Sequence, residues 1–333
     1  MQDTESITRG QFWGAVLVCL AVLGSANAVV SKMTQHSVSR RILADARNSG
    51  SATTIALGNS LMRSGFDANE FAPPQEPGGR PLALNMAMGA SSPAEHLLLL
   101  RAALRDDGQA KLLLYGFYDF QLTDPVRFSF SDLIGNHDLL YYHEPEFARR
   151  YYVMSRYDVA GFEIARRVSL LAERGAVWAK VERLRRAIAQ QGMPREASNQ
   201  FGRVADFTLL EASSQEEFVK HCEQASEAQL SAPVKEIIRE AQKRQLRVVF
   251  VLMPLPAKHL REFYDTPAWE AYRRHVKEQL TIEDVGLIDA SHWFSEPGQF
   301  GDALHLSEEG ASLFSQRLAA MCGNANRFDS CGK

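Results

Sequence analysis

Three residues of this 333-residue chain could together perform nucleophilic chemistry on a carbonyl group: Ser60, Asp302 and His305. A serine hydroxyl becomes a nucleophile when an imidazole takes its proton and a carboxylate orients that imidazole. The stretch "GDALHLSEEG" places the carboxylate and the imidazole three positions apart. On a tight turn this spacing brings the Asp302 carboxylate to Nδ1 of His305 and leaves Nε2 facing a serine. Taken alone, a D-x-x-H pair is common, and Ser60 alone would more simply be a helix cap.

The elements around these residues are typical of an open α/β fold. Ser60 lies in "TTIALGNSLMRSGFD", just after a first apolar run, and the Asp-His pair precedes a closing helix over 307–321. Short apolar runs that alternate with helical segments predict a mostly parallel five-stranded sheet in a three-layer α/β/α sandwich. Such sheets bind ligands at the carboxyl ends of their strands. The predicted strands are 53–58, 81–87, 111–117, 246–256 and 285–291.

The order of the predicted segments divides the chain into four parts. The first 31 residues form a membrane anchor or signal segment, and a polar helical stalk follows over 32–50. The main domain extends over 51–322, and a Gly/Asn/Ser-rich tail covers 323–333. Within the main domain, residues 120–230 interrupt the alternation and predict a helical insertion that forms a cap or a partner-binding face.

Residues 12–30 carry no charged side chain over 19 positions. A helix of about 20 apolar residues can cross a bilayer. The small residues Ala26-Asn27-Ala28 also fit a signal-peptidase site, so that cleavage remains an alternative. A buried helix of a soluble protein is a third interpretation, but the segment has no polar face that could lie toward solvent.

Composition excludes several classes of function. The chain is 45% hydrophobic and 23% charged, with a net charge of −3, so it has no basic surplus for nucleic acid. Its four cysteines form no C-x-x-C pair, which argues against a zinc or redox site. We therefore expect neither a metal nor a cofactor. Cys322 and Cys331 flank the tail, where a disulfide and two separate thiols are equally compatible with the sequence.

Four short motifs together resemble the SGNH (GDSL-like) hydrolases. "GNSL" at 58–61 resembles the first block, with Asn59 in place of the frequent Asp, and "NMAMGASS" at 85–92 resembles the second. "GFYD" at 116–119 stands where the third block, G-x-N-D, is expected, and "DALH" at 302–305 is similar to the fifth. The resemblance covers the sheet, residues 53–119 and 246–321, but neither the anchor nor the insertion.

This resemblance implies a catalytic triad of Ser60, His305 and Asp302, with an oxyanion held by the backbone N–H groups of Ser60 and Gly89. The usual third oxyanion donor is an asparagine, and here that position is Tyr118. Loss of such a donor typically costs about 2.7–4 kcal/mol of transition-state stabilisation. Either the Tyr118 hydroxyl replaces it, or another group does, or catalysis is weakened.

The resemblance and the anchor together imply a membrane-anchored serine esterase or O-acyltransferase. Its substrates would be acyl esters, acetyl-like, of cell-envelope polysaccharide or glycan, and its partner a membrane-bound O-acyltransferase. The alternative is a catalytically weak or inactive subunit that docks a larger membrane complex, which the Tyr118 departure favours. A lysophospholipase-like lipid esterase is a third candidate, because an anchor keeps the site near the bilayer.

The orientation of the main domain receives conflicting signals. Arg9 precedes the apolar segment, whereas Lys32, Arg40 and Arg41 follow it, and positive residues favour the cytoplasmic side. The signal-like end of the segment and the family resemblance favour the opposite side. We predict a periplasmic or otherwise extracytoplasmic domain.

Overall fold

A computed structural model describes residues 9–35, 37–74, 82–89, 91–105, 108–124, 145–151, 155–165, 167–189 and 212–323. The chain forms two compact units. The first unit comprises residues 1–41, 128–146 and 154–191, and the second comprises residues 42–127, 147–153 and 192–333. The predicted tail, including Cys331, lies outside the described residues from 324 onward, whereas Cys322 is a buried free thiol.

The second unit contains a five-stranded sheet in the order β2-β1-β3-β4-β5, and all four strand pairs are parallel. This confirms the predicted sheet. The strands are shorter than the apolar runs that predicted them: each begins one or two residues later, and the runs of β2, β4 and β5 also continue into the loops at the carboxyl ends of these strands. Their bounds are β1 Thr54–Gly58, β2 Ala83–Asn85, β3 Leu112–Phe117, β4 Arg247–Leu252 and β5 Gly286–Asp289.

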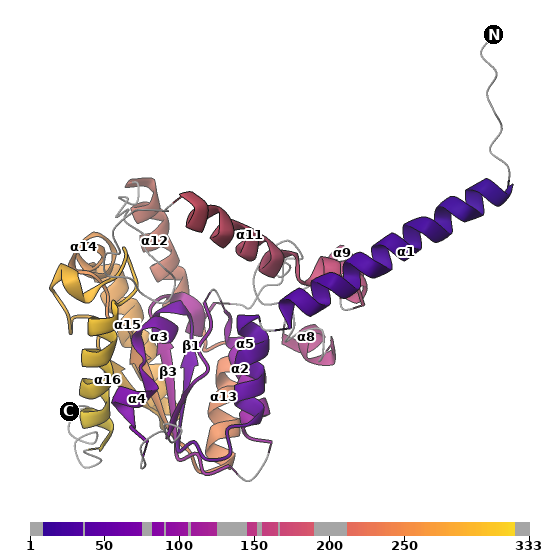
Figure 1. The fold of residues 1–333 in the computed structure, drawn as a ribbon. Coiled ribbons are helices and arrows are strands. Elements are labelled where there is room, and N and C mark those ends of the chain that lie inside the picture. The colour runs from indigo at the N-terminus through magenta and orange to yellow at the C-terminus, as the bar shows by residue number, and fades with distance from the viewer. Residues whose placement is uncertain are drawn as a thin grey trace. The chain divides into compact units, whose positions relative to one another are not determined.

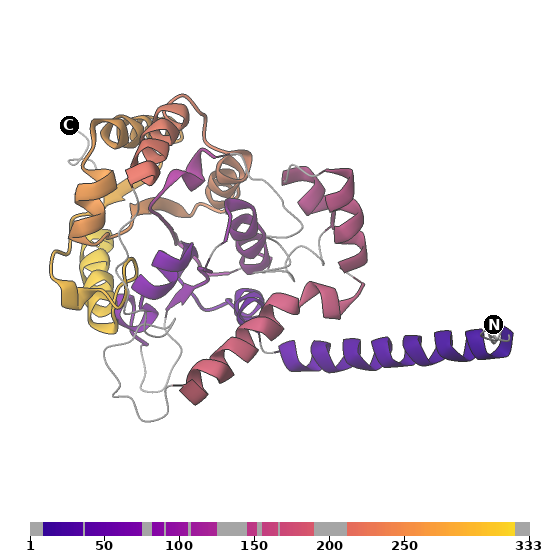
Figure 2. The same ribbon diagram turned by 90° about the horizontal axis from the view of Figure 1, so that it is seen from above.

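Helices cover both faces of this sheet. Helices α3 (Ser60–Gly65) and α16 (Glu308–Gly323) contact each other on one face, and α5 (Pro93–Ala103) and α13 (Ala232–Lys243) contact each other on the opposite face (Figure 1). The view in Figure 2, turned by 90°, shows the same two layers with the sheet between them. The remaining elements of this unit are α4 Ala68–Phe71, η1 Phe120–Leu122, α12 Ala212–Ala225, α14 Ala257–His259, η2 Leu260–Tyr264, α15 Pro267–Ile282 and η3 Pro297–Gln299.

Coverage on both faces explains the absence of polar alternation in the strands. All five residues of β1 are buried, as are the last five of β3 and of β4. Full burial of one Leu, Ile or Phe side chain contributes roughly 1.5–3 kcal/mol, so these central strands anchor the fold. Helix α5 begins with a capping box, which Ser92 and Glu95 form around Pro93.

The first unit is helical within the described residues. Its long helix α1 (Arg9–Thr34) has a mean hydropathy of 2.0 over an 18-residue window and is long and apolar enough to cross a membrane, which is also true of a signal sequence. Near its end, Asn27 accepts a hydrogen bond from the Leu170 N–H (2.9 Å), and Lys180 donates to the Met33 carbonyl (3.0 Å). The other helices in or bordering this unit are α2 Val38–Arg47, α8 Pro145–Tyr151, α9 Arg156–Ala165, α10 Ser169–Ala172 and α11 Arg174–Ala189.

Candidate active site

The strand order places a ligand site between β1 and β3. The chain leaves β1 toward β2 on one side, and leaves β3 toward β4 on the other, so the direction of winding reverses between them. Open α/β sheets bind ligands outside the carboxyl ends of the strands at such a switch point. Ser60 follows β1 at this edge, and Tyr118 follows β3.

Two glycines allow the segments at this edge to approach one another. Gly58 has φ +146°, a conformation that L side chains rarely adopt, and a Cβ there would lie 2.5 Å from the Gly116 carbonyl oxygen. A Cβ on Gly116 would lie 2.7 Å from Cβ of Met62. Because both positions lack a side chain, α3 packs directly over the end of β3. Ser60, half-buried, is the first residue of that helix, where backbone N–H groups have no partner in the helical ladder.

Asn59 connects the ends of β1 and β3. Its side-chain oxygen accepts a hydrogen bond from the Leu61 N–H (3.0 Å) and caps α3, while its Nδ2 donates to Oε1 of Gln121 (2.8 Å). An aspartate at position 59 could make the cap but could not donate to Gln121, which gives a physical reason for the asparagine. Gln121 is not recognisable from the sequence, because it lies outside the four motifs and its contact depends on strand pairing.

Asp302 and His305 form the predicted pair. His305 Nδ1 lies 2.9 Å from Oδ2 and 3.0 Å from Oδ1 of the carboxylate. The same carboxylate accepts hydrogen bonds from the backbone N–H groups of Leu304 (2.9 Å) and His305 (2.7 Å). Asp302 is 4% exposed, so it is a buried and oriented acceptor. Donation from Nδ1 selects the tautomer whose lone pair is on Nε2, the atom that a general base needs.

The loop that carries this pair packs against the helix that begins at Ser60. Cδ1 of Leu306 lies 3.2 Å from the position of a Cβ on Gly65, at the end of α3. The Ser315 hydroxyl of α16 accepts from the Asp67 N–H (2.8 Å) and donates to the Gly65 carbonyl (3.3 Å). Two segments about 240 residues apart therefore meet on one face of the sheet. A pocket of 450 Å³ opens at this junction, lined by residues of α3, α4, β2 and the start of α16.

Gly89, the predicted second oxyanion donor, lies in a turn beyond β2. The preceding residue Met88 donates its N–H to the Gly58 carbonyl (3.0 Å), so the turn continues alongside β1. A series of hydrogen-bonded side chains supports this turn. The Ser91 hydroxyl donates to the Met88 carbonyl (2.7 Å) and lies 2.6 Å from Nε2 of His96, whose Nδ1 lies 2.8 Å from the Tyr115 hydroxyl.

Tyr118 and Asp119 lie at the end of β3. Burial, reinforced by the negative charge of Asp119, raises the pKa of Tyr118, so its hydroxyl remains a donor at neutral pH. Burial also raises the pKa of Asp119 to about 6, against the opposing effect of the hydrogen bond from the Gln121 N–H (3.1 Å). Tyr118, at the third motif, therefore keeps its hydroxyl proton beside the Asp119 carboxyl.

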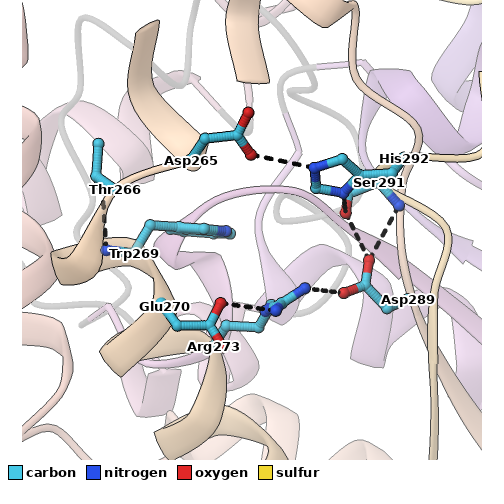
Figure 3. Close-up of polar contacts among 8 residues, drawn as sticks. All are labelled: Asp265, Thr266, Trp269, Glu270, Arg273, Asp289, Ser291 and His292. Atoms are coloured by element: carbon cyan, nitrogen blue, oxygen red, sulfur yellow. Dashed lines mark hydrogen bonds and ion pairs between the residues drawn. The ribbon is translucent and has the colours of Figure 1, made fainter. Parts of the chain in front are cut away.

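A second group of serine, histidine and aspartate residues lies at the end of β5 (Figure 3). His292 lies between Asp265 (Nε2 to Oδ1, 3.1 Å) and the Ser291 hydroxyl (Nδ1 to Oγ, 2.9 Å). Ser291 is 3% exposed, and its hydroxyl donates to Oδ1 of Asp289 (2.5 Å). The hydroxyl proton is therefore already bound by a carboxylate and is not available to His292.

Comparison with known proteins gives little guidance. No protein-family model and no curated protein matches the chain. Among solved structures it is similar to a Bacteroides fragilis protein provisionally described as an acylhydrolase, with 7% identity, a TM-score of 0.36, and coverage of 81% of this chain and 86% of that chain. Similarity at this level does not bear on activity, so the chemistry must be inferred from the residues themselves.

Proposed function

We propose that the chain is a membrane-anchored extracytoplasmic serine esterase or O-acyltransferase. In this proposal Ser60 is the nucleophile, His305 the general base and Asp302 the carboxylate that orients it. The observation that carries the proposal is the buried Asp302–His305 pair, in a loop packed against the helix that Ser60 begins.

The reaction would proceed in two balanced halves. Ser60 Oγ attacks the ester carbonyl carbon while its proton passes to Nε2 of His305. The single bond between the carbonyl carbon and the oxygen of the leaving alcohol then breaks. That oxygen takes the proton from His305, and an acyl-serine remains. In the second half, water or a sugar hydroxyl attacks the acyl carbon and gives its proton to His305, which returns it to Ser60 as the acyl group departs.

Three donors would stabilise the oxyanion of each tetrahedral intermediate. The backbone N–H groups of Ser60 and Gly89 lie on adjacent segments at the end of β1 and beyond β2. The hydroxyl of Tyr118 would provide the third, in place of the asparagine amide. Each such donor contributes about 2.7–4 kcal/mol when it is aligned with the developing charge.

The substrate class follows from the anchor and the resemblance. A body held at the membrane by residues 12–30 meets envelope polymers, so we propose acyl, acetyl-like esters of polysaccharide or glycan as substrates. A membrane-bound O-acyltransferase would be a natural partner that supplies the acyl group. A catalytically weak subunit that docks such a complex is the second candidate, which the replacement of the third donor by Tyr118 favours.

A direct test compares wild type and Ser60→Ala, both purified with the anchor in detergent. Wild type should hydrolyse p-nitrophenyl acetate and react covalently with a fluorophosphonate probe, and mass spectrometry should place the probe on Ser60. The variant should lose both reactions. Equal labelling of the two proteins, or no labelling of wild type together with a co-purifying membrane protein, would support the second candidate instead.

A further inference from the structure

A second pocket, of 470 Å³, lies where α15 begins and β5 ends. Figure 3 shows its polar side chains converging from these two elements, with His292 on one side and Arg273 and Glu270 on the other. It forms no part of the triad described above. The residues that line it are Tyr264, Asp265, Thr266, Pro267, Trp269, Glu270, Arg273 and His292.

Trp269 supplies an N–H donor directed into this pocket. The residue is only 3% exposed, and its ring packs among aromatic side chains that include Tyr264 (4.7 Å between centroids) and Tyr272 (5.1 Å). Figure 3 shows the indole nitrogen at the end of the ring that faces the space between His292 and Arg273. Among the residues that the structure describes, none accepts a hydrogen bond from it. This nitrogen is not one of the fully buried atoms without a partner, so it opens into the pocket, where a ligand oxygen can accept its hydrogen bond.

The charges around the pocket favour some ligands over others. Arg273 donates to Glu270 (2.6 Å) and also contacts Asp289, while Asp265 is paired with His292. Three carboxylates and one guanidinium give a formal charge of −3 + 1 = −2 when His292 is neutral. Such a field repels an anionic ligand, and the carboxylate oxygens accept hydrogen bonds from hydroxyl or ammonium groups.

Tyr264 connects this pocket to the candidate active site. It lines the pocket, and burial together with the charge of Asp119 raises its pKa, with a further contribution from Tyr118. Trp269, which packs against Tyr264, also packs against Phe120 just after β3, with 5.8 Å between the ring centroids. A ligand seated in the pocket would therefore lie on the same edge of the sheet as the proposed acyl-serine.

We propose that this pocket binds a sugar ring of a glycan, and that it prefers an amino sugar or a neutral sugar to a uronic acid. Sugar hydroxyls both donate and accept, which matches one directed indole N–H among several carboxylate oxygens. The role of that glycan as acyl acceptor rests on the proposed function. The binding itself is independent of Ser60.

The test uses isothermal titration calorimetry on the full chain in detergent. The probes are a glucosamine tetramer, an N-acetylglucosamine tetramer and a galacturonic acid tetramer. The glucosamine tetramer should bind at least about tenfold more tightly than the galacturonic acid tetramer. Trp269→Phe keeps an aromatic ring but removes the five-membered ring with its N–H, and should weaken binding about fivefold. Trp178→Phe makes the same chemical change on the exposed surface of α11 and should leave binding unchanged.

Asp265→Asn gives a second variant at an exposed position, in case Trp269→Phe does not fold. It removes one negative charge and should narrow the preference for the glucosamine tetramer over the galacturonic acid tetramer. Thermal unfolding verifies that each variant is folded. Binding of none of the three probes, equal binding of galacturonic acid, or equal weakening by the two Trp→Phe changes would overturn the proposal. Ser60→Ala should bind the sugar probes as wild type does. Failure of the esterase proposal would therefore not contradict the sugar-binding proposal.

Discussion

Two regions of this molecule each combine serine, histidine and aspartate at the carboxyl edge of the sheet, yet they are arranged for different purposes. At the end of β1, Ser60 begins a helix, and the Asp302–His305 pair packs against that helix from the far end of the chain. At the end of β5, Ser291 and His292 are neighbours in sequence, and Asp289 binds the hydroxyl proton of the serine. A nucleophilic serine needs a hydroxyl whose proton can pass to the base. The presence of serine, histidine and aspartate does not by itself ensure this.

The two histidines also differ in burial. The side chain of His305 is 19% exposed and its aspartate partner 6%, whereas His292 and Asp265 are 60% and 44% exposed. A buried carboxylate held by two backbone N–H groups keeps one orientation and one tautomer of its histidine. An exposed pair is solvated and screened, so it orients the imidazole less strictly. The region at β1 therefore has the rigidity expected of a catalytic base.

The largest expected effect comes from Asp302→Asn. An amide in place of the carboxylate selects the wrong tautomer of His305, and kcat for p-nitrophenyl acetate should fall by about 10⁴. Ser291→Ala, in the other region, should leave hydrolysis within about twofold of wild type, since no step of the proposed reaction uses it. Loss of activity in Ser291→Ala with retention in Asp302→Asn would place the nucleophile at β5.

Tyr118→Phe should have the next largest effect. If the hydroxyl stabilises the oxyanion, kcat should fall about a hundredfold with little change in KM, because the interaction forms only in the transition state. Full activity in the variant would show that the two backbone N–H groups suffice. Tyr272→Phe removes a buried tyrosine hydroxyl that donates to the Asp119 carbonyl (3.4 Å) and serves as the control.

Gly116→Ala and Gly286→Ala compare the same change in β3 and β5. A Cβ on Gly116 lies within 3 Å of Met62 side-chain atoms and forces α3 away from the sheet, whereas the nearest atom to a Cβ on Gly286 is at 3.5 Å. We expect Gly116→Ala to lose about 1–3 kcal/mol of unfolding free energy and Gly286→Ala much less. Chemical denaturation of the two variants measures the difference, and equal losses would contradict the close packing at the switch point.

Asp119→Asn should have the smallest effect, on pH dependence. The folded-state pKa of this carboxyl is about 6, above the value of 3.8 for the unfolded chain, so the folded state binds the proton more tightly. Its contribution to stability is therefore favourable at low pH and is lost as the pH rises from about 4 to about 6. The variant should flatten this part of the profile of melting temperature against pH. An unchanged slope would show that other groups cause this pH dependence of the melting temperature.

The switch point illustrates how far sequence reasoning extends. Gly58, Ser60 and the D-x-x-H pair were recognisable because each requires a particular residue type at a strand end or a tight turn. Gln121 was not recognisable, because its contact with Asn59 arises from the pairing of β1 with β3. The proposed sugar pocket likewise joins side chains from η2, α15 and the loop after β5, none of which forms a motif.

Local periodicity and residue chemistry determined the parallel sheet, the apolar N-terminal helix and the Asp302–His305 turn, because each depends on neighbours within a few positions. Only the tertiary structure decided that the loop of His305 packs against the helix of Ser60, that the hydroxyl of Ser291 donates to Asp289, and that the indole of Trp269 points into a pocket. Those outcomes depend on how helices pack across a sheet. Packing joins residues through shape and burial, which their order along the chain does not encode in any short pattern.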